Sequence, residues 1–183
     1  MAKFYDHLPP KYQDFVGQQK IFFVATAPLE GRLSLSPKGM DSFLCLDAHQ
    51  AAFLNVTGSG NETAAHLSQN GRITVMFCSF TKSPLILRIY GHGRSIHPRD
   101  QEWETLYPKF PPLPGARQIV LIQIESVQTS CGESVPFFEY HGERDTLNKW
   151  AEKKGPEGIV DYQKANNQKS IDGLNTGLFE PTK

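Results

Sequence analysis

The stretch ARQIVLIQIESVQTS, residues 116–130, constrains the fold more than any other part of the sequence. Apolar and polar residues alternate along it, which is typical of a β-strand with one buried and one solvated face. Shorter segments of strand-like composition lie at residues 20–39, where a Pro/Gly turn separates two strands, and at 42–47, 51–56, 72–80 and 84–97. The alternation disfavours a parallel sheet buried on both faces. The pattern therefore predicts a mainly β, antiparallel barrel or sandwich.

Helical patterns flank and interrupt the strands. They cover residues 9–19, 61–70, 98–110 and the polar stretch from 144 onward, and residues 170–177 indicate a coil tail. Gly71 is placed to end the second helix. Gly91 and Gly93 are expected to bend or bulge the strand at 84–97. We expect residues 1–140 to form the barrel and residues 141–183 to form a helical extension and tail of the same domain.

Composition excludes several classes of function. The formal net charge of zero argues against a nucleic-acid binder held by a basic field. No apolar run reaches the ~18 residues of a membrane span, and the first residues lack the apolar core of a signal peptide. Cys45, Cys78 and Cys131 have no CxxC spacing, which argues against a disulfide frame or a zinc site. We expect a cytoplasmic protein in a reducing compartment, without nucleic-acid, membrane or metal binding.

The turn between residues 56 and 63, VTGSGNET, allows two interpretations. Ser59 and Glu62 have the spacing of a capping box, in which the turn does no more than start a helix. Alternatively, the helix N-terminus binds a phosphate, since its amides are unpaired and the two glycines let backbone approach a ligand closely. Polar side chains available for the second role are Thr57, Ser59, Asn61 and Thr63.

The sequence does not match other known phosphate-binding or catalytic motifs. GSGNET ends in threonine and is not followed by the acid of a dinucleotide fingerprint, and no Gly-Lys-Ser/Thr follows for a P-loop. The six histidines show no metal-ligand spacing, and His66, on the predicted helix, is expected at the surface. No catalytic residue can be assigned.

From residue 22 to about residue 96 the chain resembles the pyridoxamine 5'-phosphate oxidase-like family, the flavin-binding split barrels. RLSLSPK resembles the family strand that ends in lysine, with Lys38 one residue late. Aligned without gaps from NGR, Thr57 falls on the family threonine and Asn61 on its serine. Arg88-Ile-Tyr-Gly resembles the later R-V-x-G. The resemblance implies an antiparallel, six-stranded split barrel of Greek-key type with flanking helices.

The resemblance also implies a cofactor, flavin mononucleotide (FMN), and a site built across the interface of a homodimer. On this basis the expected cofactor-binding residues are Ser36, Lys38, Val56, Thr57, Ser59, Gly60, Asn61, Thr63 and Arg88. The chain departs from the family where Glu62 and Thr63 replace the arginine and lysine that clamp phosphate. Ile86 also replaces the glutamine at the flavin ring.

Three functions follow from these features. The first is a flavin-dependent oxidoreductase acting on an unknown small substrate. The second is a flavin- or ligand-binding protein without catalysis, and the third is a structural homodimer. A true pyridoxamine 5'-phosphate oxidase is not expected, because the basic clamp and the arginine-rich C-terminal segment that holds the substrate are missing.

Overall fold

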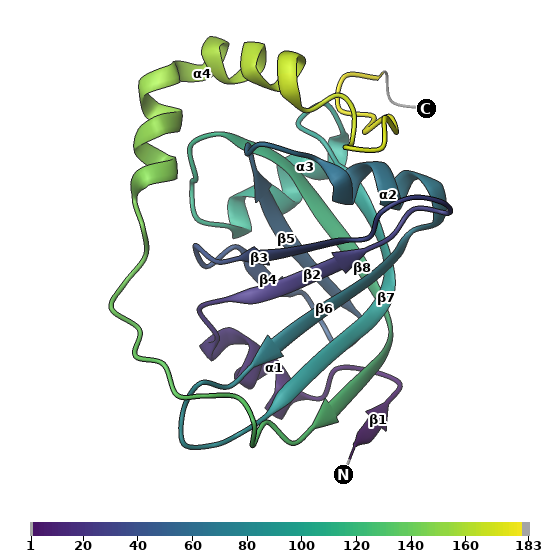
Figure 1. The fold of residues 1–183 in the computed structure, drawn as a ribbon, viewed down its shortest axis with the longest axis vertical. Helices are drawn as coiled ribbons and strands as arrows, with labels where there is room; N and C mark the ends of the chain where they lie inside the picture. Colours follow the sequence, from purple (N-terminus) through teal and green to yellow (C-terminus); the bar gives the residue numbers. More distant parts are fainter. Residues whose placement is uncertain (1, 181–183) are drawn as a thin grey trace.

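A single antiparallel sheet wraps around the core of the protein in the computed structural model, which describes residues 2–180 (Figure 1). Its strands are β1 (Lys3–Tyr5), β2 (Phe22–Thr26), β3 (Ser34–Lys38), β4 (Phe43–Cys45), β5 (Gln50–Val56), β6 (Arg72–Cys78), β7 (Ile86–Ile96) and β8 (Ala116–Ser130). They pair in the order β3-β2-β6-β7-β8-β5-β4, with β1 also on β8. Within residues 2–180 no ladder joins β3 to β4, so the barrel is split there.

This architecture confirms the predicted fold class. The sheet contains eight strands rather than six, and the three-residue strands β1 and β4 account for the difference. The expected irregularity in β7 is also present, since the register with β8 shifts between Tyr90 and Gly91. A Cβ at Gly91 would lie 2.1 Å from the Gln123 carbonyl oxygen, so only glycine fits this close approach.

The helices lie outside the barrel. They are α1 (Pro10–Gln18), α2 (Glu62–Asn70), α3 (Gln101–Leu106), continued by a 3-10 turn at Tyr107–Lys109, and α4 (Thr146–Asn166). Gly155, with a φ of 67°, breaks α4 into two arms. Between β8 and α4 the chain runs along the outside of the barrel (Figure 1). None of the helices within residues 2–180 is long and apolar enough to cross a membrane.

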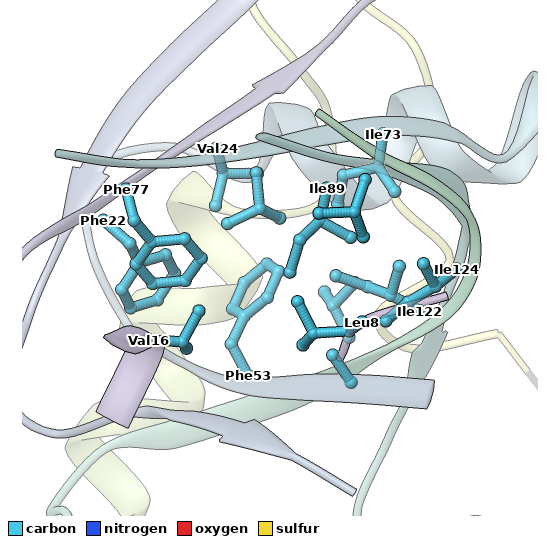
Figure 2. Packing of buried hydrophobic residues seen from close by; sticks show 14 of the residues in the cluster. Leu8, Val16, Phe22, Val24, Phe53, Ile73, Phe77, Ile89, Ile122 and Ile124 are labelled. Atoms are coloured by element: carbon cyan, nitrogen blue, oxygen red, sulfur yellow. The ribbon is translucent and has the colours of Figure 1, made fainter. Parts of the chain in front are cut away.

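Aromatic side chains from three strands fill the barrel interior (Figure 2). The ring centroid of Phe22 lies 5.8 Å from those of both Phe53 and Phe77. Val24 and Ile89 complete this part of the core and are almost fully buried. Each such side chain contributes about 1.5–3 kcal/mol through burial of apolar surface. Along β2, buried residues alternate with half-buried ones.

His66 is buried rather than exposed, so the expectation of a surface residue is wrong. Its Nδ1 lies 3.0 Å from the Thr26 hydroxyl, and the side chain has no exposed surface. The helix α2 is short, and residues on most sides of it are buried. Ala64, Ala65 and Leu67 are buried as well as His66. Burial lowers the pKa of His66, so the neutral ring is favoured.

Candidate functional site

A cavity of about 370 Å³ lies at the split of the barrel, between β3, β5 and the N-terminus of α2. Eight of the nine predicted cofactor-binding residues line it, namely Ser36, Lys38, Val56, Thr57, Ser59, Gly60, Asn61 and Thr63. Segments far apart in the sequence thus meet at one place. The remaining predicted residue, Arg88, lies on β7 and does not line this cavity. It donates a hydrogen bond to the Ser130 hydroxyl at 3.2 Å.

Lys38 crosses the split. It is the last residue of β3 and pairs in register with the buried Phe22, so its side chain follows the inward face of the strand. Its Nζ donates to the Asn55 side-chain oxygen on β5 at 3.1 Å. Burial, and secondarily the charge of Arg117, lowers the pKa of Lys38 to about 8. A half-buried ammonium without a carboxylate partner is costly, and this cost lowers the pKa.

Arg117 is the second cation at the cavity, and no sequence motif pointed to it. It lies on β8, is only 3% exposed, and its Nη1 donates to the Gly60 carbonyl at 3.0 Å. Burial lowers its pKa to about 10, an effect that Glu62 and then Tyr162 oppose. The available signal was a charged residue two positions before the apolar run at residues 119–122 of β8. Asn55, a polar residue inside the apolar run of β5, gave the same kind of signal.

The capping box, one of the two interpretations of this turn, is absent from the described residues. The helix begins after Asn61, whose side chain makes no capping hydrogen bond. Instead the Asn61 amide exchanges hydrogen bonds with Gln118, at 3.3 and 3.0 Å. The Glu62 carboxylate accepts from the backbone N–H of Ile171 at 3.3 Å rather than from the helix start. Tertiary partners therefore replace the local ones, which leaves the first-turn amides of α2 without a side-chain acceptor.

The C-terminal extension holds the turn in place. Gln163 donates to the Thr57 hydroxyl at 2.7 Å, and that hydroxyl donates to the Gly115 carbonyl at 2.8 Å. Asn167 donates to the Gly58 carbonyl at 3.0 Å. All three side chains are buried, so these bonds are protected from water. The turn is thus pre-ordered by residues about a hundred positions further along the chain.

An apolar groove of about 1070 Å³ adjoins the cavity. The two share the segments 37–40 and 57–59. Beyond them the groove is lined by Phe23 of β2, by Phe138 and Tyr140 of the segment before α4, and by Trp150 and Tyr162 of α4. A polar cavity containing cations that opens into an aromatic groove suits a ligand with an anionic end and a flat apolar body.

Comparison with known proteins agrees with this geometry. A family model described as pyridoxamine 5'-phosphate oxidase matches residues 8–131. The chain belongs to the pyridoxamine 5'-phosphate oxidase family. A member of this family from Aspergillus flavus, the pyridoxamine 5'-phosphate oxidase family protein ustO, is 36% identical over 192 residues. That alignment covers 95% of this chain and 77% of the relative.

Solved structures of other proteins share the fold. HupZ from Group A Streptococcus superposes with a TM-score of 0.52 at 18% identity, over 65% of this chain and 90% of that one. A candidate pyridoxamine 5'-phosphate oxidase from Lactobacillus delbrueckii gives 0.55 at 20% identity, over 67% and 94%. An FAD-binding protein from Mycobacterium smegmatis gives 0.50 at 12% identity, over 69% and 97%. The family fold therefore extends across proteins of low sequence identity.

Proposed function

We propose that this protein binds FMN, with the phosphate in the cavity at the barrel split and the ring in the adjoining groove. The observation that carries the proposal is the convergence of eight expected residues on a cavity lined by two cations, the buried Arg117 and the half-buried Lys38. The groove beside it supplies apolar and aromatic surface for a flat ring. Membership of the pyridoxamine 5'-phosphate oxidase family and an FAD-binding protein of the same fold add support.

The protein acts as a flavin-dependent oxidoreductase on a small substrate. A bound flavin supplies the electron-transfer chemistry itself, which is why no catalytic acid or base is required of the chain. The chain's own contribution is to bind and orient the cofactor and to exclude water from part of the groove. Pyridoxamine 5'-phosphate oxidation is not part of the proposal, because Glu62 and Thr63 stand at the positions of the family's basic clamp.

The working form is a homodimer. Leu33, which precedes β3, and Leu35, on the outward face of β3, are 70% and 62% exposed to solvent in the single chain. The segment before α4 presents Phe137 and Phe138 in the same way. Apolar side chains this exposed favour association with a second copy, and a stable interface of this type buries more than ~2,000 Å². Light scattering at low micromolar protein should give twice the mass of one chain, and a clean monomer would contradict the dimer.

A second candidate is a flavin-binding protein without catalysis. Ile86, the first residue of β7, stands where the family has a glutamine at the flavin ring, so a polar contact to the ring is lost. The two candidates differ in one experiment. In an oxidoreductase the bound flavin is reduced by a physiological reductant and reoxidised by a substrate, whereas in a pure binding protein neither rate exceeds that of free flavin.

Binding itself is tested by titrating FMN with the apoprotein and following flavin fluorescence. Saturable quenching at micromolar protein is expected. Fluorescence that stays unchanged up to several hundred micromolar protein would contradict both candidates.

A further inference from the structure

We propose that Arg117, together with Lys38, binds the phosphate monoester of the ligand in place of the basic pair that the family carries at positions 62 and 63. The inference rests on the proposed function and assigns the selectivity of its site to a residue from another strand. Arg117 then decides whether the protein distinguishes phosphorylated from unphosphorylated flavin.

The charges at the cavity do not balance. Among the described residues that line it, the charged ones are Lys38, Glu62 and Arg117. Neither cation makes an ion pair within residues 2–180. The cavity therefore has two cations and one carboxylate, which leaves an excess of about one positive charge in a largely buried cavity. Buried charges in proteins are ordinarily paired, and an anionic ligand would supply the missing partner.

Arg117 lines both this cavity and the neighbouring 740 Å³ pocket under α4. Its Nη1 bonds the carbonyl of Gly60, which lines the cavity at the split but not that pocket, so this end of the guanidinium lies at the cavity. Its Nε is buried without a hydrogen-bond partner among the described residues. A guanidinium has five N–H donors, and two of them in a fork match a phosphate. Arg117 thus retains donors for a ligand.

The N-terminus of α2 supplies further donors beside these cations. Asn61, Glu62 and Thr63 line the cavity, and the first turn has no side-chain cap. A Cβ added at Gly58 would meet nothing within 4 Å, so space remains at the turn. Free amides and a partial positive charge next to two cations form a site for a doubly charged anion.

Substitution of Glu62 is expected to change phosphate affinity in the opposite direction to substitution of Arg117. Its carboxylate lies against Gly60, where an added Cβ would come within 2.4 Å of Oε2. It attracts both cations and repels a bound phosphate. Glu62→Gln should therefore strengthen phosphate binding, while Arg117→Met weakens it.

The experiment compares FMN with riboflavin, which lacks the phosphate, by fluorescence titration of apoprotein at pH 7. The wild type is expected to prefer FMN about 10- to 100-fold, the range of one or two charge-assisted hydrogen bonds. In Arg117→Met this preference falls to within about threefold, with riboflavin affinity unchanged. Arg117→Lys retains part of it, and Glu62→Gln increases it. Arg72→Met, at an exposed arginine of β6, is the matched control and should change nothing.

Equal loss of FMN and riboflavin affinity in both Arg117→Met and Arg117→Lys would overturn the proposal, because the arginine would then only support the turn. Unchanged FMN preference in Arg117→Met and in Glu62→Gln would overturn it too. If neither flavin binds the wild type, flavin binding fails, and inorganic phosphate still tests the subsite. A rise in melting temperature with phosphate that Arg117→Met abolishes supports it, and no rise in the wild type contradicts it.

Discussion

Replacing Lys38 with methionine is expected to make the ligand-free protein more stable and to make it a weaker FMN binder. The pKa of Lys38 falls from 10.5 to about 8 on folding, with burial as the main cause. A shift of this size opposes the charged form by about 3 kcal/mol at neutral pH. The variant removes that charge but also the hydrogen bond to Asn55, and the loss of this bond lowers the free energy of unfolding by roughly 1–2 kcal/mol. The net stabilisation is about 1–2 kcal/mol.

The lowered pKa of Lys38 also fixes the direction in which stability changes with pH. Between pH 8 and 10.5 the unfolded lysine keeps its proton while the folded one has lost it, so the unfolded state binds more protons. The free energy of unfolding of the wild type therefore rises with pH across this window. The advantage of Lys38→Met is largest below pH 8 and vanishes between about pH 9 and 10, and at pH 10.5 the lost hydrogen bond leaves the variant less stable than the wild type. Arg117 and Glu62, the other charged groups at the cavity, are present in both proteins.

Urea unfolding followed by tryptophan fluorescence at pH 7, 8, 9 and 10 measures this directly. Lys82→Met, at an exposed lysine before β7, is the control and should leave stability within about 0.5 kcal/mol of the wild type. The reasoning is refuted if Lys38→Met is less stable than the wild type at pH 7. It is equally refuted if wild-type stability is flat from pH 8 to 10. Ligand binding should move the opposite way, with FMN affinity about 10- to 100-fold lower in the variant.

Three further outcomes are expected. Gly91→Ala should destabilise the protein by roughly 2–3 kcal/mol in urea unfolding, because the new methyl would overlap a backbone oxygen of β8, whereas Gly17→Ala, where nothing lies within 4 Å, should not destabilise it. Burial holds the pKa of His97 at about 4, below its usual 6.5, so stability should fall as pH drops from 6.5 to 4, and the urea midpoint of His97→Gln should fall less. Gln163→Leu removes the donor to the Thr57 hydroxyl; it should weaken FMN and riboflavin alike in fluorescence titration, because it loosens the turn rather than removing a phosphate contact.

Periodicity predicts the strands well because the alternation of inward and outward residues is written within each segment. The alternation in residues 116–130 and the Pro/Gly turn before residue 34 both correspond to observed strands, β8 and β3. Strand β1 has only three residues, too short to give a periodic pattern. His66 was misplaced because a helix packed against a barrel end buries polar positions that a helical pattern alone would leave at the surface.

Only some of the residues that line the cavity could be predicted from the sequence. Lys38 and the turn after β5 lie within one alignable stretch of sequence, so a resemblance can place them. Arg117 is distant from them along the chain and reaches Gly60 only because β5 and β8 pair. The capping box failed for the same reason, since Asn61 bonds Gln118 and Glu62 bonds Ile171. Tertiary partners that outcompete local ones leave no local sequence signal.

The most direct test of the central claim is a crystal structure of the protein grown with FMN. The phosphate oxygens are expected within about 2.7–3.2 Å of the Lys38 Nζ and of the Arg117 guanidinium. The ring is expected in the groove between Phe23 and the segment before α4. A flavin bound elsewhere, or one whose phosphate points to solvent while the cavity at the split holds only water, would contradict the account.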